Sequence, residues 1–350
     1  MSTQSYNLNI SSALAESPTE VDPAVEALRI LYVVFTEYAW IVIVLPGLFG
    51  NVMSMVMSLQ AENRRVSTCN YMTALALADS AVLIELAWGW RGLGAIFWFK
   101  ESPPSEFAKQ LMWYEGHTFG MLSGFFLAEM TIDRLIVVRN PMAARRLCTT
   151  RRACVTIVLT FIVICGVQVY IFFAYKHEPS DTKGEGPIIM TVPGAPELET
   201  LGTVFNLAFG TVLPFIVIVF CNVWIIIVLR KAAEKSGDMG VNEKTQKTRE
   251  KETTHLTRML ILVSIAYVVT SIPFRLYDVI IGLPDVKRQY DMKDEYWKLL
   301  YNCQFLIIGE FWDVNYGINF YLYCLGGGKK YRDGVKEIFR QMICKKSDDK

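Results

Sequence analysis

Seven long apolar blocks of sequence constrain what this chain can fold into. A helix that crosses the hydrocarbon core of a bilayer needs about 20 predominantly apolar residues, and it must satisfy its backbone hydrogen bonds internally. Each block reaches that length: Ile30 to Leu59, Tyr71 to Phe97, Phe107 to Val138, Ala153 to Tyr175, Leu201 to Leu229, Leu256 to Leu283 and Tyr296 to Leu325. The blocks predict an all-α membrane protein, organised as a bundle of seven transmembrane helices.

The composition agrees with a membrane protein. Hydrophobic residues make up 52% of the chain and charged residues 20%, and the mean hydropathy is +0.29. A soluble domain carries about 25% charged residues and scatters its apolar residues in short pieces. We therefore expect the chain to contact membrane lipid, and we expect no nucleic-acid partner.

Basic residues in the connecting loops predict the orientation. Lysine and arginine accumulate in loops on the cytoplasmic side of a membrane. The basic residues of the first, third and fifth connecting loops all fall on one side of the predicted bundle: Arg64, Arg65, Arg139, Arg145, Arg146, Arg151, Arg152, Arg230, Lys231, Lys235, Lys244, Lys247 and Arg249. The sequence thus predicts a multi-pass plasma-membrane protein with its N-terminus outside and its C-terminus inside.

The two ends of the chain have separate characters. Residues 1–29 are predicted to form an extracellular tail, in which Asn9 begins a glycosylation sequon. Residues 30–325 form the predicted bundle. Residues 326–350 are predicted to form a cytoplasmic amphipathic helix with a short tail, because apolar residues recur there at helical spacing. These residues are Tyr331, Val335, Ile338, Phe339 and Met342, and Cys344 beyond them is a candidate for palmitoylation.

Polar residues recur inside the predicted spans. Such residues are costly in lipid, so they usually face the interior of a bundle or a wet cavity. Asn315 and Asn319 are four residues apart, which places them on one face of a helix. The predicted polar cluster consists of Asn51, Asp79, Ser123, Asn315 and Asn319.

An ordered series of motifs runs through these spans. It comprises Gly50-Asn51, Leu75 to Asp79, Asp133-Arg134-Leu135, Pro214, Pro273, and Asn319 with Tyr323. On these residues the chain resembles a rhodopsin-like (class A) G-protein-coupled receptor, divergent and peptide-receptor-like or chemosensory-like. The resemblance covers about residues 30 to 344, and it implies a signalling receptor that binds an extracellular ligand and activates a heterotrimeric G protein.

The resemblance also implies roles for individual residues. Arg134 matches an arginine that pairs with its neighbouring acid, here Asp133, at rest and turns toward the G protein on activation. The alternative is an arginine that anchors the helix end at the membrane surface. Pro214 and Pro273 match prolines whose kinks let the inner helix ends swing. The polar cluster matches one that holds an allosteric sodium ion around Asp79, and the alternative is an ion-free hydrogen-bond network.

Several positions depart from the family pattern. The third-helix cysteine of the family is replaced near Lys109, and the loop between residues 176 and 200 has no cysteine to bridge to it. Asn222, Ser271 and Phe320 stand where the family has switch residues. These changes bear on activation, so the alternative is a receptor-like protein with weak, constitutive or non-G-protein signalling.

The ligand class follows in part from elimination. Amine receptors of the family carry an aspartate where this chain has Gly116, and opsins carry a lysine where it has Asp313. We expect a neuropeptide or a small polar ligand, because charged and aromatic side chains gather in the outer halves of the spans. The pocket candidates are Glu85, Trp88, Arg91, Glu115, His117, Arg275, Tyr277, Glu310 and Asp313. Arg275 could instead neutralise Glu310 or Asp313 between helices.

Two other classes of protein are disfavoured. A transporter would show an internal repeat of hydropathy or broken half-helices, and the sequence has neither, so a small transporter is the less favoured alternative. An enzyme would need a nucleophile or a metal-binding cluster, whereas His117, His177 and His255 lie in three different segments. We expect no enzymatic activity and no cofactor beyond the possible sodium ion.

Overall fold

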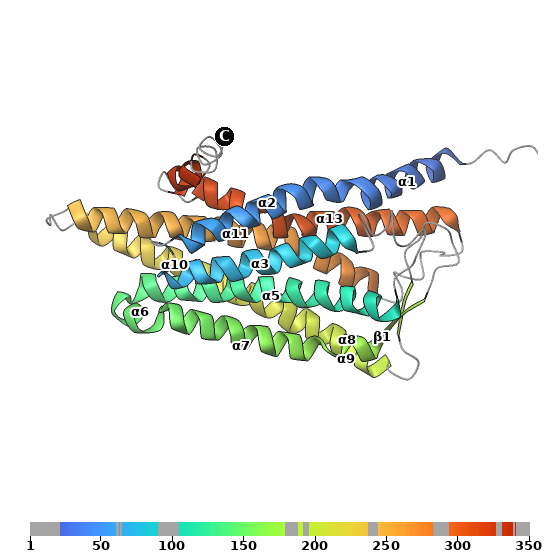
Figure 1. The fold of residues 1–350 in the computed structure, drawn as a ribbon, viewed down its shortest axis with the longest axis horizontal. Helices are drawn as coiled ribbons and strands as arrows, with labels where there is room; N and C mark the ends of the chain where they lie inside the picture. The colour runs from blue at the N-terminus through green and yellow to red at the C-terminus, as the bar shows by residue number, and fades with distance from the viewer. Residues whose placement is uncertain are drawn as a thin grey trace, which may run out of the picture.

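The computed structural model describes residues 22–60, 63, 65–89, 105–178, 188–191, 196–236, 244–282, 294–326, 331–338 and 340. Within them, seven helical rods form an elongated bundle (Figure 1). In chain order the rods are α1 (Pro23–Val33) with η1 (Val34–Ala39) and α2 (Trp40–Leu59); α3 (Ser67–Trp88); α5 (Glu106–Arg139); α7 (Thr150–Gln168) with α8 (Ile171–Ala174); α9 (Pro196–Leu207) with η2 (Ala208–Val212) and α10 (Leu213–Ser236); α11 (Lys244–Gly282); and α13 (Glu295–Gly326). The predicted seven-helix bundle is confirmed.

Two small elements mark opposite ends of the bundle (Figure 1). The short helix α6 (Pro141–Leu147) connects α5 to α7, and we call its end of the bundle the α6 end. Strands β1 (Tyr175–Glu178) and β2 (Ile188–Thr191) pair antiparallel at the other end, which we call the hairpin end. The hairpin adds two strands to a fold that the sequence predicted to be all-α.

Side-chain caps explain where several helices begin. The Asp22 carboxylate accepts a hydrogen bond from the Ala24 N–H (2.9 Å), and Pro23 follows in the first helical position. Asn140 and Pro141 repeat this arrangement at α6. Helix α3 ends at Trp88, before the predicted bound at Phe97, and the N–H of Gly89 there donates to the Glu85 carbonyl oxygen (2.6 Å).

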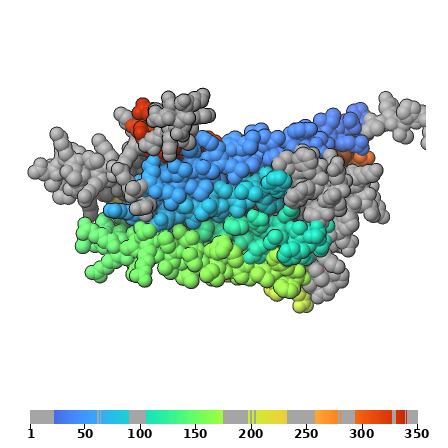
Figure 2. All heavy atoms as spheres, viewed as in Figure 1, coloured from blue at the N-terminus to red at the C-terminus, as the bar shows by residue number. Residues whose placement is uncertain are grey.

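The bundle is packed inside and apolar outside. Helix α5 lies centrally, in contact with α3, α7 and α10, and Leu122 and Met130 on it are fully buried. Apolar side chains also cover the outer face, where Val42 is 76% exposed. Figure 2 shows one face of the molecule, along which α2, α3, α5 and α7 lie side by side. Apolar exposure on this scale fits a surface that meets lipid.

Five helices in the described residues are long and apolar enough to cross a membrane by length and composition alone. They are Pro23–Leu59, Ser67–Trp88, Thr150–Ala174, Val204–Lys231 and Arg258–Tyr277. Helices α5 and α13 complete the bundle but contain more charged residues. Asp133 on α5 and Glu310 and Asp313 on α13 are buried inside the bundle, as expected for ionisable groups at membrane depth.

Glycines let two helices approach closely. A Cβ atom added to Gly47 on α2 would lie 2.9 Å from the Cα atom of Gly317 on α13, which is closer than a real Cβ contact. A side chain at Gly47 would therefore push the two backbones apart. This contact places Asn51, one turn further along α2, against α13.

The chain after α13 turns back onto the bundle. Residues 331–338 are helical, and Ile338 is buried against Met53 and Met57 of α2 and Phe320 of α13. The predicted amphipathic helix therefore directs part of its apolar face at the protein. Cys344 and Asn9 lie outside the described residues.

Candidate functional site

Asp79, in the middle of α3, is fully buried where three helices meet. Its carboxylate accepts hydrogen bonds from Ser123 Oγ on α5 (2.6 Å) and from Asn319 Nδ2 on α13 (2.8 Å). Three residues of the predicted polar cluster are thus joined directly. Because each comes from a different helix, the acid ties α3, α5 and α13 together.

The other two residues of the polar cluster make different contacts. Asn51 donates its Nδ2 to the backbone oxygen of Tyr316 (3.0 Å), and its Oδ1 has no hydrogen-bond partner among the described residues. Asn315 is buried four residues before Asn319. The cluster offers carboxylate, hydroxyl and amide oxygens, which are the donors that a hard cation takes. The same groups also satisfy the Asp79 carboxylate by hydrogen bonds when no ion is bound.

Asp133 and Arg134 are both buried near the α6 end of α5. The Asp133 carboxylate accepts hydrogen bonds from Ser67 Oγ (2.8 and 2.9 Å to its two oxygens) and Thr68 Oγ1 (2.8 Å), the first two residues of α3. Among the described residues, neither an ion pair nor a hydrogen bond joins Asp133 to Arg134. The resting pair that the resemblance implies is absent because hydroxyl groups of α3 hold the carboxylate instead.

The remaining switch candidates lie on three helices. Tyr323 is buried, and its ring meets Tyr331 of the C-terminal helix edge-on, at 6.3 Å between ring centroids. Pro214 is the second residue of α10, just after the π-helical turn η2 ends at Val212, as expected where a proline removes a backbone donor. Pro273 lies inside α11.

The departures at the three switch positions, Asn222, Ser271 and Phe320, are all buried. Phe320 packs edge-on against Phe49 of α2, at 6.2 Å between centroids. Ser271 Oγ and Asn222 Oδ1 have no hydrogen-bond partner among the described residues. Phe320 therefore makes a packing contact between α13 and α2, whereas Ser271 leaves little side-chain volume at its position.

An aromatic layer fills the bundle between α11 and α13. It consists of Phe274, Trp312 and Tyr316: Trp312 stacks on Phe274 (4.7 Å between centroids, 5° between planes) and meets Tyr316 edge-on at 5.4 Å. The Arg275 guanidinium lies 5.0 Å from the centroid of Trp312. A Cβ at Gly120 of α5 would lie 3.1 Å from Tyr316 Oη, so a glycine there makes room for the layer.

This layer was missed in the sequence, apart from Arg275. Trp312 and Tyr316 are four residues apart and therefore share a helix face, which was the available signal. The layer adjoins the polar cluster, because the Tyr316 backbone oxygen accepts the hydrogen bond of Asn51. The ion pair of Arg275 with Glu310 or Asp313, which was the alternative to ligand contact, does not form among the described residues; its guanidinium stacks on aromatic rings.

The other ligand candidates are spread over four helices. The half-buried Glu85 carboxylate lies beside Gly116, where a Cβ would be 3.3 Å from its Oε2. His117 Nδ1 lies 2.9 Å from the Trp113 backbone oxygen. Trp88 is 47% exposed, Glu115 and Tyr277 are half-buried, Glu310 and Asp313 are buried, and Arg91 lies outside the described residues.

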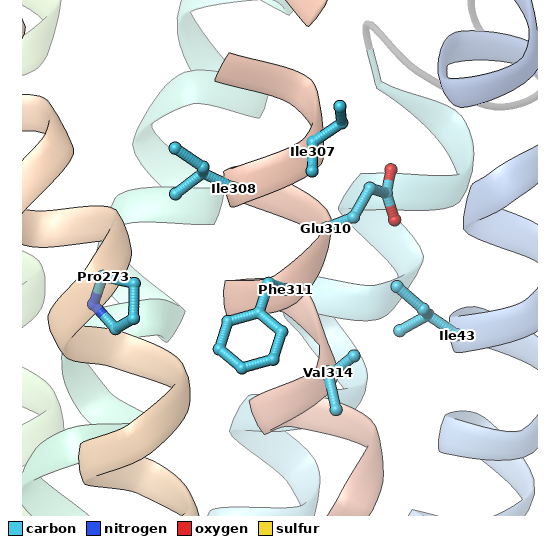
Figure 3. Close-up of a pocket in the computed structure, with 7 residues that line it drawn as sticks. All are labelled: Ile43, Pro273, Ile307, Ile308, Glu310, Phe311 and Val314. Atoms are coloured by element: carbon cyan, nitrogen blue, oxygen red, sulfur yellow. The ribbon is translucent and has the colours of Figure 1, made fainter. Parts of the chain in front are cut away.

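A shallow groove of about 390 Å³ crosses the outer side of α13. Figure 3 shows Ile43 of α2 and Pro273 of α11 on either side of α13, and the lining is apolar except for Glu310. Phe311 and Ile307 in the lining are 45% and 42% exposed. The groove therefore opens away from the bundle interior, and Glu310 alone among the ligand candidates lines it.

Comparison with known proteins agrees with this architecture. The family described as 7 transmembrane receptor (rhodopsin family) matches residues 50–307. The chain is 23% identical over 279 residues to the somatostatin receptor type 2 of Sus scrofa (78% of this chain, 70% of the relative). It is 26% identical over 241 residues to the B1 bradykinin receptor of Canis lupus familiaris (66% and 64%), and 24% identical over 240 residues to the cysteinyl leukotriene receptor 1 of Mus musculus (67% and 62%).

The chain thus spans less than two thirds of the bradykinin and leukotriene receptors, and somewhat more of the somatostatin receptor. The family match covers well over half of this chain, from the first rod to the last. The bundle, the order of its motifs and this match agree: the chain belongs to the rhodopsin family of seven-transmembrane receptors, which are multi-pass proteins of the plasma membrane and signalling receptors rather than enzymes.

Proposed function

We propose that this receptor binds an extracellular ligand at the hairpin end and activates a heterotrimeric G protein at the α6 end. The N-terminus is then outside the cell and the C-terminus inside. The orientation is supported by Arg145 and Arg146 in α6 and by Arg151 and Arg152 at the start of α7, since basic residues favour the cytoplasmic side.

The position of Arg134 gives G-protein activation its main support. Its guanidinium is buried at the α6 end, yet its Nε has no hydrogen-bond partner among the described residues. A buried, charged donor without a partner is costly, so a partner protein that offers acceptor groups at this end would bind it favourably. The basic residues of α6 and of the start of α7, Arg145, Arg146, Arg151 and Arg152, lie at the same end of the bundle.

Substitution of Arg134 tests this proposal. We expect Arg134→Ala to abolish nucleotide exchange on G proteins co-expressed with the receptor, measured as basal exchange and as the response to a library of amidated peptides and polar metabolites. The matched control is Arg139→Ala, because Arg139 lies on the same helix and stacks over Trp224 at 5.0 Å. Unchanged exchange in Arg134→Ala would remove the main support for G-protein coupling.

The ligand is proposed to be a peptide or a small polar molecule. Two of the relatives are named for the peptides somatostatin and bradykinin. Charged side chains with aromatic neighbours, such as Arg275 over Trp312, also suit polar ligand groups. Glu85→Gln and Arg275→Gln should each weaken the response to a library hit, whereas substitutions in the outer groove, such as Ile307→Val, should not.

We further propose that the polar cluster binds sodium. The support is chemical: the cluster brings the Asp79 carboxylate together with the Ser123 hydroxyl and the amide of Asn319. The purified receptor should unfold at a higher temperature in sodium chloride than in N-methylglucamine chloride of equal concentration, and Asp79→Asn should remove the difference. Equal melting temperatures for the unmodified receptor would favour the ion-free network.

A further inference from the structure

The hydroxyl groups that hold Asp133 come from the first turn of α3, which is a favourable place for an anion. Ser67 and Thr68 follow Val66, which occupies the N-cap position without a capping side-chain hydrogen bond. The unpaired N–H groups of a helix N-terminus carry a partial positive charge, so a carboxylate beside them is stabilised. The Ser67 hydroxyl, shared between the two carboxylate oxygens at 2.8 and 2.9 Å, and the Thr68 hydroxyl at 2.8 Å add to this effect. Asp133 is therefore anchored to α3 without any contribution from Arg134.

Among the described residues, Arg134 forms neither an ion pair nor a hydrogen bond with Asp133, its neighbour in sequence. Its side chain is 5% exposed, and its Nε finds no hydrogen-bond acceptor in the described part of the chain. The charge of Asp133 acts on it electrostatically without a direct contact among the described residues, and the thiols of Cys69 and Cys148 also lie near it, but a thiol is a weak acceptor. The Cys148 Sγ itself donates to the Asp133 backbone oxygen (3.5 Å). The charge of Arg134 is thus balanced at a distance and is not held by a direct contact.

From this geometry we propose that Ser67 and Thr68 are positioning residues that set the basal activity of the receptor. By holding the Asp133 carboxylate on α3, they keep it from pairing with Arg134, so the arginine remains available to a G protein in the absence of ligand. This inference rests on the proposed function, because it concerns the regulation of the same coupling surface. It adds that the unliganded receptor signals, and it identifies the residues responsible.

Removal of the two hydroxyls tests the inference in a distinctive direction. In Ser67→Ala/Thr68→Val, the Asp133 carboxylate loses its partners on α3 and turns to Arg134. Basal nucleotide exchange, normalised to surface expression, should then fall about three- to tenfold, as expected for a two-state equilibrium shifted by hydrogen bonds to a charged group. The conservative exchange Ser67→Thr/Thr68→Ser retains both hydroxyls and should restore the basal signal.

Two further variants separate this role from a loss of structure. Thr73→Val removes a hydroxyl of the same helix that bonds only to its own backbone, at Cys69 O (3.0 Å), and should leave basal exchange unchanged. In a receptor that already carries Asp133→Asn, Ser67→Ala/Thr68→Val should not change basal exchange further, because the carboxylate that would pair with Arg134 has been removed. Melting temperatures of all variants identify any that fail to fold.

Basal exchange in the double variant and ligand-driven exchange in Arg134→Ala together distinguish failure of the positioning role from failure of the proposed function. A basal signal that is unchanged or increased in the double variant overturns the inference, as does a wild-type receptor with no basal exchange. If Arg134→Ala loses ligand-driven exchange in either of these cases, G-protein coupling stands and the positioning role alone is wrong. If Arg134→Ala changes nothing, the proposed function itself is wrong.

Discussion

Two sets of contacts inside the bundle, the buried polar contacts of α3 with α5 and α13 and the aromatic layer between α11 and α13, are of different kinds. From the middle of the bundle to the α6 end, buried polar side chains of α3 and α5 meet through hydrogen bonds, as in the contacts of Asp79 with Ser123 and of Asp133 with Ser67. Toward the hairpin end, Arg275 and Trp312 meet by stacking, and several polar candidates are half-exposed. Hydrogen bonds demand particular atoms at particular distances, whereas stacking tolerates many rings.

The kind of contact determines how well a position tolerates substitution. A buried hydrogen-bonded group that loses its partner is left unsatisfied, so substitutions toward the α6 end should be costly even when they are small. The aromatic layer should accept another ring, because its contacts depend on area and approximate geometry. Substitutions test this difference, and the largest effect is expected at Gly47, where α2 meets α13.

Gly47→Leu should have the largest effect, because the leucine side chain would push α2 away from α13. The added side chain would meet the Gly317 backbone at 2.9 Å, and overpacking of this kind costs about 3 kcal/mol or more. We expect the variant to be lost from the cell surface. Gly166→Leu is the matched control, since no atom lies within 4 Å of a Cβ there, and its surface expression should equal that of the unmodified receptor.

Ser123→Ala should be the next most damaging change, although it removes a single atom. Asp79 would lose a hydrogen bond of 2.6 Å in a fully buried site, at a cost of about 1–2 kcal/mol. The melting temperature of the purified receptor should fall by several degrees. Ser80→Ala, whose hydroxyl bonds within its own helix to Ala76 O, should change it little; equal effects of the two variants would contradict a special role for the cluster.

Trp312→Phe tests how well the aromatic layer tolerates substitution. A phenyl ring can still stack on Phe274, so the cost should stay near 1 kcal/mol or below. The fall in melting temperature should be smaller than for Ser123→Ala, although more atoms are removed. A larger fall would show that the aromatic layer tolerates substitution no better than the polar cluster does, and the proposed difference between the two sets of contacts would be wrong.

The smallest effect concerns Cys148, in the loop between α6 and α7. Burial, followed by the charge of Asp133, raises the pKa of its thiol to about 12 from a usual value of 9.0. Folding therefore holds this proton more tightly, and the resulting stability is complete below pH 9 and is lost as the pH rises toward 12.

Alkylation of Cys148 by N-ethylmaleimide between pH 7 and 9 should then be at least about tenfold slower in the folded receptor than in the denatured one, because the thiolate is the reactive form. Mass spectrometry of the peptide that contains Cys148 follows the reaction. Equal rates in the two states would show that the thiol is not held in its protonated form.

Much of the fold was predictable because its signals are local. Apolar length placed the seven rods. The helix starts at Pro23 and Pro141 were not predicted: the first span was expected to begin at Ile30, although Asp22 with Pro23 and Asn140 with Pro141 are local capping signals. The end of α3 at Trp88 was missed, because the apolar run continues beyond Gly89 and hides the stop. The hairpin was also missed, since strands of four residues give little periodicity.

The candidate site was predictable only in part. Asp79 and Asn319 were recognised as polar groups in apolar helices, and the structure brings them together. The partners of Asp133 could not be read from the sequence, because Ser67 and Thr68 are ordinary hydroxyl residues more than sixty positions away. Trp312 was hidden among many aromatic residues, and only its stacking on Phe274 distinguishes it.

By itself, the sequence determined that this chain crosses a membrane with seven helices, which residues within them are polar, and in what order its motifs occur. Those properties follow from hydrophobicity and helical period, which each segment expresses alone. The tertiary structure decided which polar groups meet. Asp133 pairs with α3 rather than with Arg134 because packing brings two hydroxyls and a helix N-terminus to the carboxylate, and no local pattern records that approach.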